Sequence, residues 1–88
     1  MSDAFSDRLD ATLAELKAQG VEIVRILASA DAMERIFRER GEAAILLDCD
    51  PKRDIGWYMS EFEIEAQAAP GASVMYRQDG RTLHAVVE

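Results

Sequence analysis

Cysteine is nearly absent from this sequence of 88 residues, and its single copy, Cys49, cannot form a disulfide within the chain. A small chain without disulfides depends on its hydrophobic core, or on a partner subunit, for its stability. Hydrophobic residues make up 49% of the sequence and charged residues 31%, which are proportions typical of a folded chain. Because 88 residues are enough for one domain and too few for two, we expect residues 1–88 to form a single domain.

The sequence also lacks a long apolar segment and any excess of basic residues. Its longest apolar run, Ala43 to Leu47, is far shorter than a membrane span, and residues 1–7 have neither the basic start nor the apolar run of a signal peptide. We therefore expect a cytoplasmic protein without membrane contact. Ten basic residues against 17 acidic residues give a net charge of −7, which argues against direct binding to nucleic acid.

Residue types that carry catalysis or bind metal ions are few and isolated. His84 is the only histidine, so no second histidine or cysteine cluster accompanies it in a zinc site. Cys49 stands between Asp48 and Asp50, whose charges oppose formation of the reactive thiolate. Asp48, Asp50 and Asp54 carry oxygen ligands that suit a hard cation, but two basic residues stand among them, so a solvated turn is the better interpretation. We expect no enzyme activity, no catalytic residue, no cofactor and no metal ion.

Two segments have the apolar spacing of amphipathic helices. The first runs from Ser2, a candidate N-cap, to Gln19 before Gly20, and its apolar residues recur every three or four positions at Phe5, Leu9, Leu13 and Leu16. The second begins with a capping box formed by Asp31 and Glu34 and ends at Arg40 before Gly41. Its apolar face consists of Met33, Ile36 and Phe37.

The remaining segments favour strands. Val21 to Leu27 is β-branched and apolar, although it also suits a backward extension of the second helix. The apolar run within Glu42 to Cys49 is typical of a strand covered on both faces, and Ile55 to Gln67 alternates with period two as one long strand. Asp79 and Gly80 predict a two-residue hairpin turn between Ser73–Arg77 and Thr82–Val87. This register pairs Tyr76 with Leu83, Val74 with Ala85 and Met75 with His84.

These elements together predict an α+β fold. We expect two helices packed on one face of a mainly antiparallel sheet of four to five strands, in the order α-β-α-β-β-β-β. Sequential strands joined by short turns favour a meander, in which neighbours in sequence are neighbours in the sheet.

Most of the negative charge falls in one part of the chain. Residues 42–69 contain seven acidic and two basic residues, a balance of −5. On one continuous strand, Glu61, Glu63 and Glu65 would share a face at intervals of about 6.6 Å, twice the strand rise. Such an anionic row resembles a nucleic-acid backbone, but it is also typical of a solvated face that keeps a strand soluble.

The aromatic residues next to this row suggest a second kind of contact surface. Alternation places Trp57 on the face of the glutamates and Tyr58 on the face of Phe62. Because one core cannot lie on both sides, either the sheet is covered on both faces or Trp57 contributes to a contact surface, as tryptophan often does.

We expect a small acidic protein that acts by protein–protein contact. In size and charge it resembles phage-encoded anti-CRISPR and anti-restriction inhibitors, which implies a partner with a basic surface that normally binds nucleic acid. The predicted partner-binding residues are Glu61, Glu63, Glu65, Trp57, Asp48, Asp50 and Asp54. The alternative is an accessory or regulatory subunit of a bacterial complex that binds through an apolar sheet face. Thr82 to Val87 is a candidate edge strand, and edge strands invite pairing, so a homodimer and a monomer are both left open.

Overall fold

The computed structural model describes residues 4–47 and 55–87. Two helices and six strands follow one another as α1 (Phe5–Ala18), β1 (Glu22–Ala28), α2 (Ala30–Arg40), β2 (Ile45–Leu47), β3 (Ile55–Tyr58), β4 (Phe62–Ala66), β5 (Ala72–Gln78) and β6 (Arg81–Val87), with one 3₁₀ turn, η1 (Glu42–Ala44), between α2 and β2. The α+β class is confirmed. The strand count is six, because the segment predicted as one strand over residues 55–67 is a hairpin.

The six strands form one mixed sheet in the order β2-β3-β4-β1-β5-β6. Strand β1 lies at the centre, parallel to β4 on one side and antiparallel to β5 on the other. The predicted meander is therefore wrong at this point. The chain leaves β4 through residues 67–71 and passes the end of β1, where the Gln67 N–H donates to the Ala28 carbonyl and the Ser29 N–H donates to the Gly71 carbonyl.

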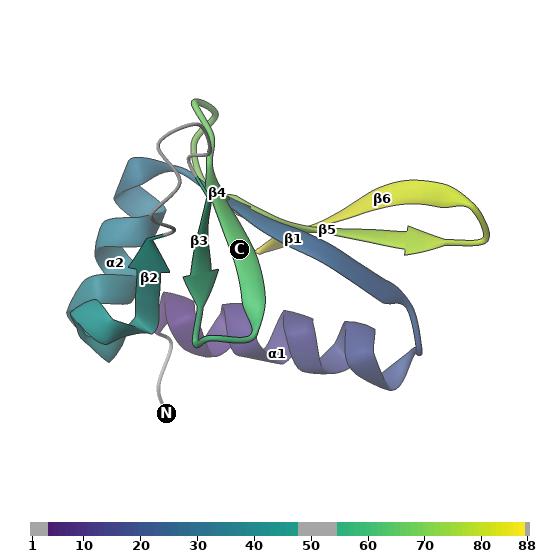
Figure 1. Ribbon diagram of the computed structural model, residues 1–88, viewed down its shortest axis with the longest axis horizontal. Coiled ribbons are helices and arrows are strands. Elements are labelled where there is room, and N and C mark those ends of the chain that lie inside the picture. The colour runs from purple at the N-terminus through teal and green to yellow at the C-terminus, as the bar shows by residue number, and fades with distance from the viewer. Residues whose placement is uncertain (1–3, 48–54, 88) are drawn as a thin grey trace.

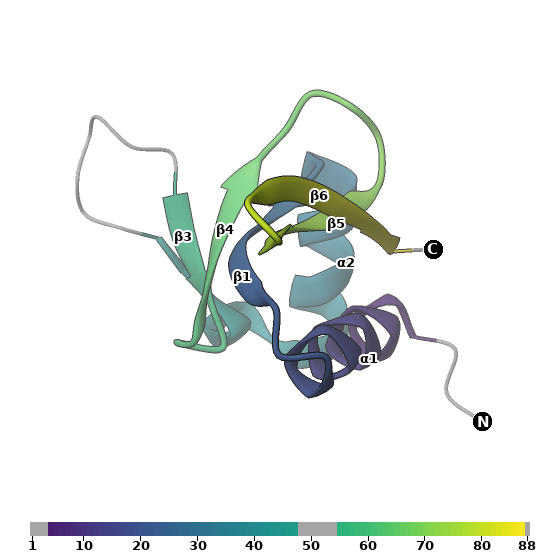
Figure 2. The same ribbon diagram turned by 90° about the vertical axis from the view of Figure 1, so that its right-hand side faces the viewer.

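Both helices lie on one side of the sheet. Figure 2 shows α1 and α2 on one side of the molecule and strands β3 and β4 on the other, whereas Figure 1 looks at the sheet from the side away from the helices. The β5–β6 hairpin extends away from the helices at one end of the molecule (Figure 1). The fold therefore has two layers, and the sheet has one covered face and one face without a helix.

A single apolar cluster joins the helices to the covered face. The predicted stripe of α1 is buried, and Ile36 of α2 is fully buried beside it. From the sheet, alternate residues contribute to the same cluster, namely Ile26, Ala28, Ile45, Tyr58, Ile64, Ala72, Val74 and Val87. The period-two burial along the strands shows that this sheet places apolar residues on the helix side.

The helix starts differ from those predicted. Ser29 is the N-cap of α2 and its hydroxyl accepts a hydrogen bond from the Ala32 N–H at 3.2 Å, so the predicted cap at Asp31 is wrong by two residues. At α1 the first turn is capped by another helix. The Glu39 carboxylate of α2 accepts hydrogen bonds from the Ser6 N–H at 2.7 Å and the Phe5 N–H at 3.2 Å. Ser2 lies outside the described residues.

The C-terminal hairpin matches its prediction in every pair. Tyr76 pairs with Leu83, Val74 with Ala85 and Met75 with His84. Asp79 and Gly80 both have positive φ, which the two-residue turn requires. Val21 to Leu27 is likewise confirmed as a strand rather than a helix extension.

Two predictions about the middle of the chain are wrong. The strand predicted from residue 42 begins at Ile45 after the 3₁₀ turn, and it is an edge strand with Leu46 exposed rather than a strand covered on both faces. Residues 55–67 do not continue straight, because Met59, Ser60 and Glu61 turn the chain back. In the part of the chain that is described, no helix is long and apolar enough to cross a membrane.

Candidate functional site

The face of the sheet opposite the helices is the candidate contact surface, and we call it the open face. The strand register lines up its side chains in two rows. One row runs from β2 to β6 through Leu46, Trp57, Glu63, Arg25, Met75 and His84, and the other crosses β4 to β6 through Glu65, Leu27, Ser73 and Val86. No helix of the described residues covers these rows.

Large apolar side chains are exposed on the open face. Trp57 is 40% exposed and its cross-strand neighbour Leu46 is 51% exposed, and Val86 near the other edge is 71% exposed. Exposed apolar residues scattered singly are ordinary, but an aromatic and an aliphatic side chain side by side form a patch. The alternative in which helices cover the sheet on both faces is therefore wrong for the described residues.

The centre of the open face is an ion-pair cluster. Arg25 of β1 lies between the two glutamates of β4, with its Nη1 2.9 Å from Glu65 Oε2 and its Nη2 3.9 Å from Glu63 Oε2. All three side chains are partly buried, so neighbouring residues fix their positions better than at a fully exposed pair. Arg25 thereby cancels one of the two negative charges on which the anionic row depends.

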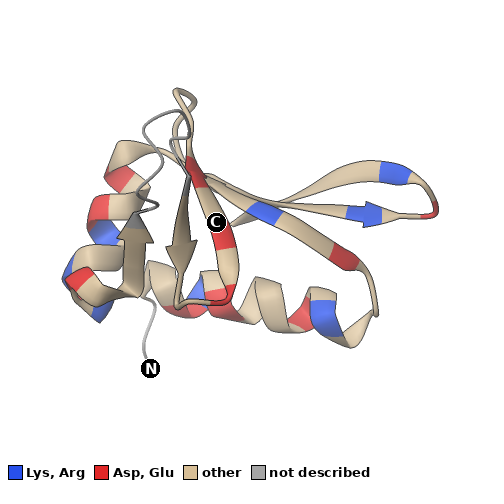
Figure 3. Cartoon of the chain, in the orientation of Figure 1, with Lys and Arg blue, Asp and Glu red and all other residues tan. Residues whose placement is uncertain are grey.

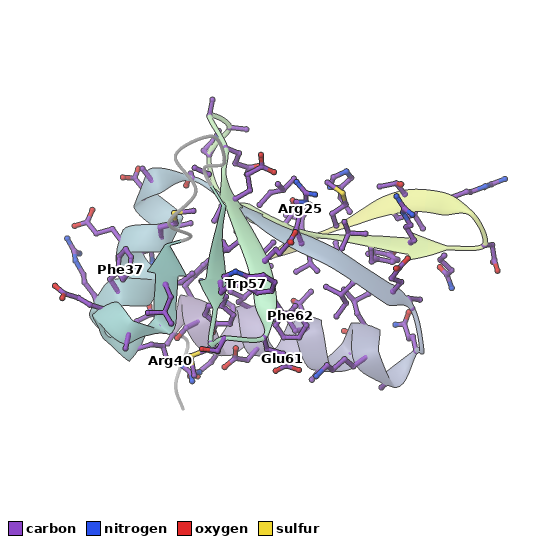
Figure 4. The ribbon with its side chains drawn as sticks, viewed as in Figure 1. Arg25, Phe37, Arg40, Trp57, Glu61 and Phe62 are labelled. Carbon is purple, nitrogen blue, oxygen red and sulfur yellow. The ribbon has the colours of Figure 1, made fainter. Side chains whose placement is uncertain are left out.

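The predicted row of three glutamates does not exist. Glu61 lies in the turn between β3 and β4, near α1, where it forms an ion pair with Lys17. Figure 4 shows Glu61 close to the helix and well apart from Arg25, and Figure 3 shows basic residues placed among the acidic ones along the sheet. Only Glu63 and Glu65 share the open face. Asp48, Asp50 and Asp54, also predicted for partner binding, lie outside the described residues.

A shallow groove lies on the other side of the molecule, between α1 and the β3–β4 turn. It has a volume of about 290 Å³, and its walls include Leu13, Tyr58, Met59 and Phe62. The Lys17 ammonium group lies 5.2 Å from the centre of the Phe62 ring, and Lys17 also pairs with Glu61, which lines the groove as well.

The remaining polar cluster holds the helices to the sheet. Arg40 of α2 donates hydrogen bonds to Asp10 at 2.6 Å, to Asp7 at 2.8 Å and to the hydroxyl of buried Ser6 at 3.1 Å. The Tyr58 hydroxyl of β3 donates to the same Asp10 carboxylate at 2.7 Å. We call Ser6, Asp7, Asp10, Arg40 and Tyr58 the clasp. Figure 4 places Arg40 at the end of α2 beside the lower end of β3.

The pKa shifts in and beside the clasp have simple causes. Burial raises the pKa of Tyr58 well above its ordinary value, and the hydrogen bond to Asp10 raises it further. The Asp10 charge raises the pKa of Arg40. Hydrogen bonds donated by the Ser6 and Phe5 N–H groups lower the pKa of Glu39. Each shift favours the ionisation state in which the group makes its contact with another helix or strand. These groups therefore stabilise the packing of the helices against the sheet.

Neither a metal centre nor a known relative identifies a chemistry for this chain. Within residues 4–47 and 55–87, no three histidine, cysteine or acidic side chains converge to hold a metal ion. Comparison with protein-family models finds no match, and comparisons with curated proteins and with solved structures also find none.

Arg25 belongs to the open face but is not among the residues that the sequence predicted for it. Its only local signal was a basic residue within an apolar strand. Its role depends on the parallel pairing of β1 with β4, 40 residues further along the chain, and alternation within either strand cannot reveal that pairing.

Proposed function

We propose that this chain is a non-enzymatic binding protein that docks on another protein through the open face, with Trp57 at the centre of the contact. The single observation that carries the proposal is the exposed Trp57–Leu46 pair on a sheet face without a helix. Tryptophan supplies a large apolar area with few rotatable bonds, and it is enriched among the residues that dominate binding energy.

Charge on the open face narrows the chemistry of the partner. Arg25, Glu63 and Glu65 sum to a charge of −1 and are paired with one another. A complementary surface would be mainly apolar and close to neutral, with a few polar groups that reach the ion-pair cluster. This corresponds to the accessory-subunit alternative more closely than to a mimic of nucleic acid.

Acidic mimicry of nucleic acid is the second candidate, and it rests on the net charge of −7 and the −5 balance of residues 42–69. Its geometric basis is weaker than the sequence indicated. Glu61 pairs with Lys17, and Glu63 and Glu65 face Arg25, so two cations accompany the three glutamates.

Capture of a partner by variant proteins tests the proposal. Trp57→Ala should weaken binding by about 2 kcal/mol or more, because a central aromatic anchor is lost. Met59→Ala is the matched control, since Met59 is a comparably exposed apolar residue that lines the groove and not the open face. A partner that is retained by Trp57→Ala and lost by Met59→Ala would contradict docking on the open face.

The variant Arg25→Gln separates the two candidates. If the partner docks on an apolar surface, Arg25→Gln leaves Glu63 and Glu65 without their cation in the contact, so binding of the partner should weaken. For an acidic mimic the same change increases the negative charge of the surface, so binding to a basic partner should become faster and more sensitive to salt. Association rates at two salt concentrations distinguish these results.

A further inference from the structure

Strand β6 (Arg81–Val87) is the outer strand at one end of the sheet, and within the described residues no strand pairs with its outer edge. In a hairpin with a two-residue turn, the two residues that flank the turn exchange backbone hydrogen bonds, and bonded pairs then alternate with non-bonded pairs. Gln78 and Arg81 flank the turn, so the backbone N–H and C=O groups of Thr82, His84 and Val86 point outward.

This edge lacks most of the features that protect edge strands from pairing, and its one charged residue, Arg81, lies at its end. It is seven residues long and contains no proline and no lysine, and its pairing with β5 runs without a bulge. The opposite edge, β2, has only three residues. Within residues 4–47 and 55–87, the protein therefore exposes one long edge, at β6, that can accept a further strand, and a three-residue edge at β2.

We propose that two copies of this chain pair antiparallel through β6 around a two-fold axis at His84, joining two six-stranded sheets into one. In this register His84 faces the His84 of the second copy, and Thr82 faces the Val86 of the second copy. The three outward-facing residues of each strand then satisfy one another's backbone groups. The two open faces become continuous across the axis, and this pairing does not depend on what docks on them.

Charge does not oppose a second copy at this edge. Residues 72–87 contain two basic residues and one acidic residue, a net charge of +1. Because the whole chain has a net charge of −7, the remaining residues have a net charge of −8. Two copies of an acidic protein repel each other least where the local charge is not negative. Arg81, at the end of the strand, is the only Asp, Glu, Lys or Arg among the residues 81–87 that meet across the axis.

The packing around the edge also agrees with self-pairing. Val86 is 71% exposed and Leu83 is 36% exposed, on opposite faces of β6. In the two-fold register Val86 would contact Thr82 of the second copy on the open face, and Leu83 would contact Ala85 of the second copy on the helix side. Both exposed apolar side chains thus gain a neighbour from one pairing.

Variants with charged residues at positions 82 and 86 test the register, because these two positions face each other across the axis. Thr82 and Val86 are exposed, so their replacement should leave the fold intact. Thr82→Lys with Val86→Lys places like charges opposite each other across the axis and should weaken the dimer roughly tenfold or more. Thr82→Glu with Val86→Lys places opposite charges there and should restore it. Within one copy positions 82 and 86 are about 13 Å apart, so an ion pair between the two new side chains can form only between copies. Arg77 of β5 faces position 82 in the same copy, so urea unfolding of each variant is measured as well, to separate an effect on the hairpin from an effect on the dimer.

Sedimentation or light scattering over a range of protein concentrations measures these effects on the full chain. We expect the wild-type protein to dimerise, the double-lysine variant to shift toward monomer, and the glutamate–lysine variant to return to dimer. A monomeric wild-type protein at every concentration would overturn the proposal. Equal weakening by both variants would also overturn it, since that result indicates an edge that binds another extended segment without two-fold symmetry. A dimer unaffected by either variant would place the contact elsewhere.

Discussion

The two faces of the central sheet differ in what their side chains do. On the helix side, Ile26 and Ile64 are 0% exposed and pack against both helices in one cluster. On the open face, their sequence neighbours Arg25 and Glu63 form a partly exposed ion-pair cluster beside Trp57. Successive residues of one strand point to opposite faces of the sheet. We therefore expect a substitution at a residue of the covered face to lower the stability of the fold, and a substitution at the next residue, on the open face, to weaken binding.

The largest expected effect is on the covered face. Ile64→Ala removes a fully buried side chain at the centre of the sheet, and it should lower the free energy of unfolding by about 2–5 kcal/mol. Glu63→Ala, one residue away on the open face, should change it by no more than about 0.5 kcal/mol, since its contact with Arg25 is long. Urea unfolding of both variants measures the difference, and equal losses would contradict the division of the two faces.

The clasp should give the next largest effect. Tyr58→Phe removes the hydrogen bond to Asp10 from a buried site and should cost about 1–2 kcal/mol. The pKa of Tyr58 is raised above its ordinary value of 10.0, so its contribution is complete below that pH and is lost as the pH rises through the raised value. The wild-type protein should therefore lose stability in alkali, and the variant should lose less. If both proteins show the same alkaline loss, Tyr58 is not its source.

A smaller effect is expected where α2 caps α1. Glu39→Gln weakens the acceptor for the Phe5 and Ser6 N–H groups and should cost about 0.5–1 kcal/mol near neutral pH. Because the pKa of Glu39 is lowered from its ordinary value of 4.5, its contribution is present above that pH and is lost as the pH falls through the lowered value. The difference between wild type and variant should shrink in acid. A difference that stays constant from neutral pH to pH 3 would show that the charge of Glu39 is not involved.

The sequence predicted correctly those helices and turns that depend on interactions between residues close together in the chain. The stripe of α1 depends on spacing within one helix, and the β5–β6 register depends on Asp79 and Gly80. The division of residues 55–67 had no such signal, because Met59 and Ser60 adopt positive φ without a glycine or proline to mark the turn. The Met59 N–H donates to the Ala44 carbonyl at 2.7 Å, so a contact from another part of the chain helps to hold the turn.

The sides of the sheet were nevertheless assigned correctly for Trp57 and Tyr58. The hairpin pairs Tyr58 with Phe62 and Trp57 with Glu63, and the members of each pair are four and six positions apart in the sequence, which are even numbers. Simple alternation therefore places each pair on one face whether the segment is straight or folded back. Glu61 was misplaced because it lies in the turn itself, where alternation does not apply.

Trp57 is the only tryptophan in the chain, so its fluorescence reports on the open face alone. The most direct test of the account is quenching of this fluorescence by acrylamide in the free protein and in the complex with a captured partner. We expect ready quenching in the free protein, and a blue shift with protection from acrylamide in the complex. Unchanged emission and unchanged quenching in the complex would contradict the claim that the open face makes the contact.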